Sequence, residues 1–144
     1  MLARVPHPYA RSDGEDFLGK ARRNAVSGRS FFLIVEYDGR LIGGIGIGAM
    51  PYICEFGYWL ARPHWGKGFA TEASRAVLAY GFDVLRLRFV RSGVFVDNPA
   101  SLRVQHKLGF RRVGVGLKRS LARGSEVAHI DTVLTPARFR QSVR

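Results

Sequence analysis

The sequence of 144 residues predicts a single α/β (α+β) domain in which helices flank a mixed sheet. Three observations lead to this prediction. Two strand-like runs flank a turn dipeptide, further strand-like runs alternate with segments of helical spacing, and two of the helices begin directly after a strand. Hydrophobic residues make up 47% of the chain, which is enough to build one core.

The first half of the chain predicts a helix followed by a hairpin. Small and apolar residues at helical spacing predict a helix over about 14–26 that stops near Gly28. Two β-rich runs follow, joined by Asp38-Gly39, a dipeptide that accepts the positive φ angles of a tight turn. Four glycines in the second run indicate that a backbone or a ligand lies close to it: Gly43, Gly44, Gly46 and Gly48.

The second half predicts a strand over 54–62 that ends before Pro63, a helix over 70–84, a strand over 88–97, a short helix ending at Gly109, and two strands over 111–135. On the first of these helices the expected inner face consists of Ala70, Ala73, Val77, Tyr80 and Val84. Asn98 is the expected N-cap of the short helix, and Pro99 suits its first position. The order helix, hairpin, strand, helix, strand, helix, hairpin is that of a mixed sheet.

Charge and cysteine content limit the partners. The net charge of +12 favours an anionic partner, which could be nucleic acid, an acidic protein or a phosphate-rich ligand. The basic residues are scattered from Arg4 to Arg144. Cys54 is the only cysteine, so no disulfide forms within the chain, and no metal site is expected. Without a long apolar run or an apolar leader segment, we expect a cytoplasmic protein with no membrane partner.

The stretch HWGKGFATEA, residues 64–73, predicts a phosphate-binding turn. A glycine-rich turn before a helix exposes unpaired N–H groups, and the helix dipole adds partial positive charge there. Gly66 and Gly68 would let a phosphate reach the backbone, and Lys67 would add a mobile cation. The spacing is that of neither a P-loop nor a dinucleotide-binding fingerprint, and an ordinary tight turn is the alternative.

Two blocks carry a family resemblance: EFGYWLARPHWGKGFATEA at 55–73, followed by VDNPASLRVQHKLGF at 96–110. In this order they resemble the Gcn5-related N-acetyltransferases (GNAT), specifically the RimJ/RimL-like branch of ribosomal-protein N-terminal acetyltransferases. The resemblance implies a central mixed, mostly antiparallel sheet and acetyl-CoA as co-substrate, with its pyrophosphate on a (Q/R)-x-x-G-x-(G/A) loop. Trp65 stands where Gln or Arg is usual, as it does in that branch. The implied cofactor-binding residues are Leu60, Ala61, Trp65, Gly66, Lys67, Gly68, Phe69, Ala70, Thr71, Asn98 and Ser101.

Acetyl transfer to an amine requires a group that takes the amine proton and one that protonates the departing thiolate. Many relatives use a tyrosine as the acid, but Gln105 occupies that position here and cannot donate a proton at a useful pKa. The resemblance instead implies Ser101, in the first turn of its helix, as acid or hydrogen-bond donor near the CoA sulfur. A serine that satisfies only its own helix end is the alternative.

Glu55 is the candidate base. Strand alternation places it on the face opposite Phe56, and a carboxylate there could take the amine proton through water. A solvent-side strand residue is the alternative. His129 and Asp131 share a face of the last strand, where they could line the acceptor pocket or form a cross-strand structural pair.

Relatives usually carry a strand and a helix ahead of the segment that matches PHPY, whereas only a few residues precede it here. We therefore expect one N-terminally shortened GNAT-like domain over 1–144, lacking the usual first strand and part of the first helical region. The sheet edge left uncovered favours a homodimer.

The predicted function is acetyl-CoA-dependent N-acetyl transfer, made directly in a ternary complex, to the primary amine of a protein N-terminus or a small molecule. Two alternatives remain: a non-catalytic acyl-CoA-binding or regulatory module, and an RNA-associated acetyltransferase that acts on aminoacyl-tRNA, since the positive charge suits an RNA or ribosomal partner.

Overall fold

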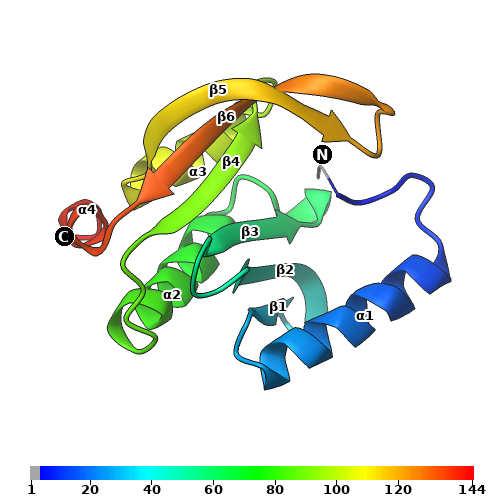
Figure 1. Ribbon diagram of the computed structural model, residues 1–144, viewed down its shortest axis with the longest axis horizontal. Coiled ribbons are helices and arrows are strands. Elements are labelled where there is room, and N and C mark those ends of the chain that lie inside the picture. The colour runs from blue at the N-terminus through cyan, green and yellow to red at the C-terminus, as the bar shows by residue number, and fades with distance from the viewer. Residues whose placement is uncertain (1–3) are drawn as a thin grey trace.

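The computed structural model describes residues 4–144 and confirms the predicted fold class. The strands form one sheet of order β1-β2-β3-β4-β6-β5, in which every neighbouring pair is antiparallel except β3 with β4 (Figure 1). The strands are β1 (Phe31–Tyr37), β2 (Arg40–Gly48), β3 (Glu55–Leu60), β4 (Val90–Phe95), β5 (Arg111–Ser120) and β6 (Ser125–Leu134). The helices are α1 (Arg11–Val26), η1 (Arg62–His64), α2 (Phe69–Asp83), α3 (Pro99–Leu108) and α4 (Pro136–Ser142).

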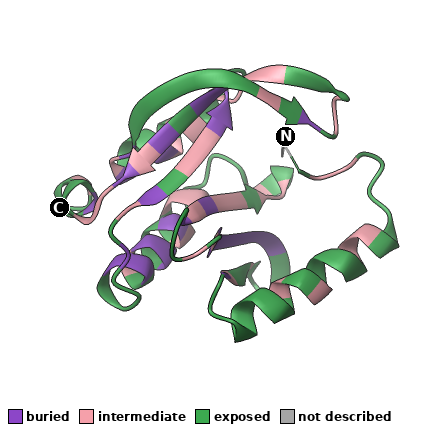
Figure 2. Cartoon of the chain, viewed as in Figure 1, coloured by how far each residue is buried: buried purple, intermediate pink, exposed green. Residues whose placement is uncertain are grey.

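Helices cover both faces of the sheet, and two adjacent residues of β1 show how. Phe32 contacts Phe17 of α1, with ring centroids 5.6 Å apart, whereas Phe31 contacts Tyr80 of α2 at 5.4 Å. Because neighbouring residues of a strand point to opposite faces, α1 and α2 lie on opposite sides of the sheet. The α2 side holds the core, and Figure 2 shows that α1 itself stays largely exposed.

The predicted hairpin is present, with Asp38 and Gly39 at φ 52° and 71° between β1 and β2. Gly43, Gly44 and Gly46 of β2 have close neighbours, as expected, whereas a Cβ on Gly48 would make only an ordinary contact at 3.8 Å. A Cβ built on Gly44 would lie 2.6 Å from the indole nitrogen of Trp59, and one on Gly46 would overlap the carbonyl oxygen of Phe31. These positions let Trp59 and the neighbouring strand lie directly on the backbone of β2.

The inner face of α2 differs from the prediction. Tyr80 and Val84 are exposed, and the buried residues are Ser74, Val77, Leu78, Gly81 and Phe82. The helix is rotated toward β2, where a Cβ on Gly81 would lie 3.0 Å from the side chain of Ile47. Close approach at a glycine, rather than the apolar stripe alone, sets which face is buried.

The helix ends also differ from the prediction. α1 begins at Arg11 instead of near residue 14, because the Asp13 side chain accepts a 2.8 Å hydrogen bond from the backbone N–H of Ala10. α4 was not predicted at all. Its only buried residue, Phe139, packs on Phe82 of α2 with ring centroids 5.5 Å apart, which closes the end of the core.

Candidate functional site

The site forms where β3 and β4 separate. These parallel strands pair at Glu55 and Arg91, and the Ser92 hydroxyl then donates a 3.0 Å hydrogen bond to the carbonyl of Phe56. Beyond this tie the strands diverge, and a cleft of about 780 Å³ opens between them. Its walls include the ends of β3 and β4, the N-termini of α2 and α3, and the turn between β5 and β6.

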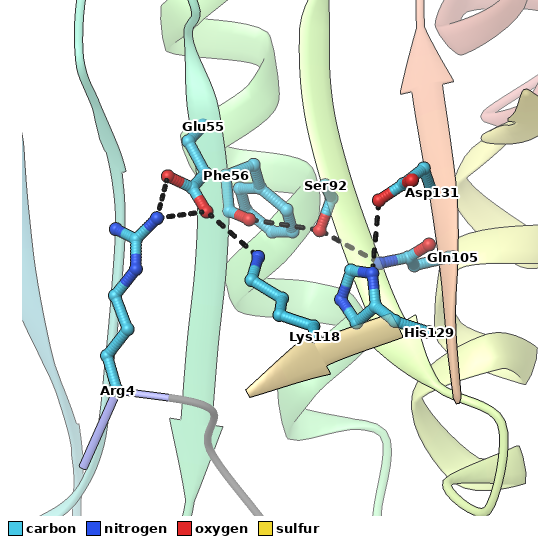
Figure 3. Close-up of polar contacts among 8 residues, drawn as sticks. All are labelled: Arg4, Glu55, Phe56, Ser92, Gln105, Lys118, His129 and Asp131. Carbon is cyan, nitrogen blue, oxygen red and sulfur yellow. Dashed lines mark hydrogen bonds and ion pairs between the residues drawn. The ribbon is translucent and has the colours of Figure 1, made fainter. Parts of the chain in front are cut away.

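A chain of buried hydrogen bonds fixes the point of separation. The Gln105 amide donates to the Ser92 hydroxyl at 2.9 Å, and the Thr132 hydroxyl donates to the Gln105 carbonyl oxygen at 2.8 Å (Figure 3 shows Gln105 and Ser92). Only 3% of Gln105 is exposed. The residue at the position of the family tyrosine therefore joins α3 to β4 and β6 and does not face the cleft as an acid.

The turn before α2 leaves its backbone open to a ligand. Gly66 and Gly68 have φ of +74° and +87°, and no heavy atom lies within 4 Å of a Cβ built on either. Gly68 is the N-cap of α2, so the free N–H groups of the first turn follow it. Trp65 closes the turn through a 2.6 Å hydrogen bond from its indole N–H to the carbonyl of Leu60.

Most residues expected to bind the cofactor line this cleft: Leu60, Trp65, Gly66, Gly68, Phe69, Ala70, Thr71, Asn98 and Ser101. Ala61 and Lys67 are not among its lining residues. The cleft also meets residues the sequence did not single out, notably Tyr58 and the N-terminal segment Val5–His7. The roles of all these residues in binding stay predictions.

The start of α3 holds Ser101 as expected. The Asn98 side chain accepts a 3.2 Å hydrogen bond from the Ser101 N–H, which confirms Asn98 as the cap. The Ser101 hydroxyl lies 3.2 Å from the phenol oxygen of Tyr58. Burial raises the pKa of Tyr58, while the hydrogen bond with Ser101 acts in the opposite direction. Tyr58 therefore keeps its proton near neutral pH, and the two hydroxyls can share a proton-donating role.

Glu55 lies on the face of the sheet that points away from the core, because its neighbour Phe56 turns into the core. Its carboxylate accepts hydrogen bonds of 3.0 and 3.2 Å from Arg4, and the ammonium of Lys118 lies 3.9 Å away (Figure 3). About a third of the side chain is exposed, at 36%. Glu55 is therefore a partly exposed strand residue held between two cations, and it does not line the cleft.

His129 and Asp131 also lie on this face and contact each other along β6, so the predicted cross-strand pair is wrong. The imidazole Nδ1 is 3.0 Å from the carboxylate of Asp131, and 9% of the His129 side chain is exposed. Burial is the main cause that lowers the pKa of His129, and Lys118 acts in the same direction, whereas Asp131 and Glu55 oppose them. The imidazole is therefore neutral near pH 7.

The sequence did not predict an ion pair at the mouth of the cleft. Arg123, in the turn between β5 and β6, donates hydrogen bonds of 2.7 and 3.1 Å to Asp97 at the end of β4. Its guanidinium lies 5.2 Å from the ring centre of Phe95. The hydrogen bond from Arg123 lowers the pKa of Asp97. The contact anchors the hairpin turn against the cleft, where Arg123 and Ala122 form part of the wall.

Residues 4–144 contain neither a metal-binding cluster nor a helix that could span a membrane. No group of three or more His, Cys, Asp or Glu side chains is arranged to hold a metal ion there. Over the same residues, none of the helices has both the length and the apolar character needed to cross a bilayer.

A mixed sheet that opens between two parallel strands, with the N-termini of two helices at the opening, defines an α/β domain suited to a phosphate-bearing ligand. The family model described as an acetyltransferase (GNAT) domain matches residues 1–111, and the chain belongs to this family.

Relatives agree with this assignment. The chain is 36% identical over 112 residues to the probable N-acetyltransferase YjcK of Bacillus subtilis, an alignment that covers 74% of this chain and 61% of YjcK. Mycobacterium smegmatis RimJ, solved in complex with CoA-disulfide, superposes with a TM-score of 0.80 at 26% identity, over 90% of this chain and 64% of that one. Spermidine N-acetyltransferase from Vibrio cholerae, solved with CoA and spermine, shares the fold with a TM-score of 0.78 at 24% identity, over 93% and 80%.

The chain covers only part of the curated relatives. The alignments span 44%, 49% and 61% of the length of three of them.

Proposed function

We propose that this protein is an acetyl-CoA-dependent N-acetyltransferase that moves the acetyl group directly to a primary amine within a ternary complex. The observation that carries the proposal is the cleft between β3 and β4, which brings the bare glycine turn of α2 and the Ser101–Tyr58 pair of α3 and β3 to one opening. Membership of the acetyltransferase family gives the class of reaction.

The residues fit acetyl-CoA on physical grounds. The left-handed φ at Gly66 and Gly68, and the open space where their Cβ atoms would be, leave room for a pyrophosphate against the first turn of α2. Lys67 is exposed beside this turn and adds positive charge from solvent. When bound, acetyl-CoA supplies an activated acetyl group and a thiol leaving group.

Ser101 and Tyr58 are proposed as the acid side of the reaction. Ser101 stands in the first turn of α3, where the helix dipole stabilises negative charge that develops nearby. Tyr58, kept protonated by burial, can replace a proton that Ser101 gives up, because the two oxygens are 3.2 Å apart. The sequence predicts Glu55 as the base. Its contacts with Arg4 and Lys118 leave its carboxylate engaged by cations before any amine arrives.

The acceptor is proposed to be the amine of a protein N-terminus or a small molecule. The RimJ/RimL-like resemblance favours a protein N-terminus, and the net charge of +12 favours an acceptor carried on an anionic partner over a free polyamine, which is itself cationic. A ribosomal or RNA partner would satisfy the same charge. A homodimer that covers the exposed strand β1 is part of this proposal.

A CoA-release assay tests the proposal. We expect the chain to release CoA from acetyl-CoA with at least one member of a panel made of spermidine and of peptides with a free N-terminal serine, with and without acidic residues after it. Binding of acetyl-CoA without CoA release across a broad amine panel would favour the non-catalytic module. Salt-dependent RNA binding by the free protein would favour the aminoacyl-tRNA alternative.

Ser101→Ala tests the proposed acid. The variant should lower kcat roughly tenfold to a thousandfold, since proton transfer contributes about that much, while leaving acetyl-CoA affinity nearly unchanged. Ser12→Ala is the matched control, because Ser12 is an exposed serine in the first turn of α1. Unchanged turnover in Ser101→Ala would leave Ser101 as a helix-end residue only.

A further inference from the structure

The imidazole of His129 packs against the backbone of β4 at Gly93. A Cβ built on Gly93 would overlap the ring, lying 2.6 Å from Nε2, so the ring can lie across β4 only because residue 93 is a glycine. Gly93 directly follows Ser92, the last residue that ties β4 to β3. His129 therefore sits at the point where the two strands separate, on the face opposite α2.

The bond with Asp131 fixes which imidazole nitrogen is free. A carboxylate only accepts hydrogen bonds, so Nδ1 carries the proton and donates it to Asp131. Nε2 is then the unprotonated nitrogen, and among residues 4–144 the hydrogen bond of the His129 ring is that of Nδ1. An imidazole that is neutral near pH 7, with its basic nitrogen free and the other held by a carboxylate, is prepared to accept a proton.

The ring lies close to the wall of the cleft. Phe95, on the neighbouring strand, meets the ring edge to face at 5.5 Å, and Phe95 in turn lies under Arg123 of the cleft wall. Val5–His7 and Trp59 also line the cleft, so it extends toward the face that carries His129. His129 itself is not a lining residue of the cleft, and Phe95 connects its ring to Arg123 of the wall.

The charged groups that act on His129 come from three strands. Asp131 is on its own strand, Lys118 is on β5, and Glu55 is on β3, while the uncharged residues Gly93 and Phe95 of β4 contact the ring. Lys118 also pairs with Glu55 at 3.9 Å (Figure 3). Glu55 therefore balances the ammonium that would otherwise stand alone beside the imidazole.

We propose that His129, oriented by Asp131 and seated on Gly93, is the base that takes the proton of the acceptor amine, with Glu55 acting through Lys118 as a positioning residue. This inference rests on the proposed function. The amine nitrogen forms a bond to the acetyl carbon as the carbon–sulfur bond of acetyl-CoA breaks. The displaced amine proton goes to Nε2, and the leaving thiolate takes a proton from the Ser101–Tyr58 pair.

The experiment compares the pH dependence of kcat and of kcat/KM in the full chain, with acetyl-CoA and the best acceptor of the amine panel. His129→Gln should lower kcat by about a hundredfold or more and remove the acidic limb that belongs to the imidazole, with acetyl-CoA affinity unchanged. Asp131→Asn should move that limb to lower pH, because Asp131 raises the pKa of His129. Glu55→Gln should keep the limb but move it to lower pH, because Glu55 also raises the pKa of His129.

Two glycine variants test whether catalysis depends on the position of the His129 ring on β4. Gly93→Ala should reduce kcat in the same way as His129→Gln, because the new methyl group displaces the ring. Gly116→Ala is the matched control: Gly116 pairs with His129 from β5, and a Cβ there meets nothing within 4 Å. We expect this control to keep the parent rate and pH profile.

The outcomes distinguish the two proposals. If the parent protein releases no CoA with any amine, the proposed function fails, and the base assignment fails with it. If the parent turns over while His129→Gln keeps both its rate and its acidic limb, only the base assignment is overturned. Loss of the limb in Glu55→Gln but not in His129→Gln would return the role of base to Glu55. Circular dichroism and the melting temperature of each variant show that it is folded.

Discussion

Gly68→Ala is the sharpest test of the phosphate-binding turn. Gly68 caps α2 with φ +87° and ψ −11°, a left-handed conformation that residues with a side chain adopt at a cost. A methyl group at this position meets no protein atom within 4 Å, so the substitution causes no clash in the free protein. It occupies the space in which we place the pyrophosphate.

The expected magnitudes follow from these two facts. The left-handed conformation should cost about 1–2 kcal/mol of folding stability. If the methyl group prevents one charge-assisted hydrogen bond between the backbone and the pyrophosphate, binding should lose about 1.5–3 kcal/mol. That loss corresponds to acetyl-CoA binding weaker by roughly tenfold to a hundredfold.

Calorimetric titration with acetyl-CoA, beside thermal melts, measures both quantities. Gly28→Ala is the control, because Gly28 has φ +68°, open space at its Cβ position, and lies outside the cleft lining. The two variants should lose similar stability, but only Gly68→Ala should lose affinity. Equal affinity in the parent and in folded Gly68→Ala would refute the placement of the pyrophosphate.

Three further predictions concern the buried hydrogen bonds at Gln105, the pH dependence of stability and self-association at the sheet edge. Gln105→Leu should destabilise the fold by about 1–3 kcal/mol in urea titrations, because the buried hydroxyl of Thr132 loses its acceptor, whereas exposed Gln141→Leu should change little. Equal effects of the two substitutions would contradict this role. The pKa of His129 is lowered in the fold, so the unfolded chain binds more protons below about pH 6.5. The free energy of unfolding should therefore fall as the pH drops through that value. His129→Gln should remove this component of the acid sensitivity. Ile34 is 67% exposed on the edge strand β1, and Ile34→Lys should abolish self-association in sedimentation experiments. Val115→Lys, on the other edge strand, should not. A parent protein that stays monomeric at high concentration would refute the dimer.

The parts of the fold that the sequence predicts are those governed by local chemistry. The turn at Asp38-Gly39, the Asn98 cap and the glycine turn before α2 each depend on a few adjacent residues, and the structure has all three. The α2 face and helix α4 were missed because both depend on partners distant in the chain. Gly81 approaches Ile47 of β2, and Phe139 packs on Phe82.

The candidate site divides in the same way. Strand alternation puts Tyr58 on the same face as Phe56, opposite Glu55, yet its contact with Ser101 spans 43 positions in the sequence and depends on how α3 docks. The seating of His129 on Gly93 depends on strand register, which a sequence pattern does not determine. Residue type and face were predictable, and the contacts between elements were not.

The topology explains why these groups meet at all. Strand β3 is followed by helix α2 and then by the parallel strand β4, and such a crossover returns the chain to the same end of the sheet. The carboxyl ends of both strands therefore lie together, and each is followed by the N-terminus of a helix, in the case of β3 after η1 and the glycine turn. One N-terminus carries the glycine turn at Gly68 and the other carries Ser101. The tie from Ser92 to Phe56 marks where pairing ends, so a ligand between the strands would meet both helix ends, with His129 beside the same point on the opposite face.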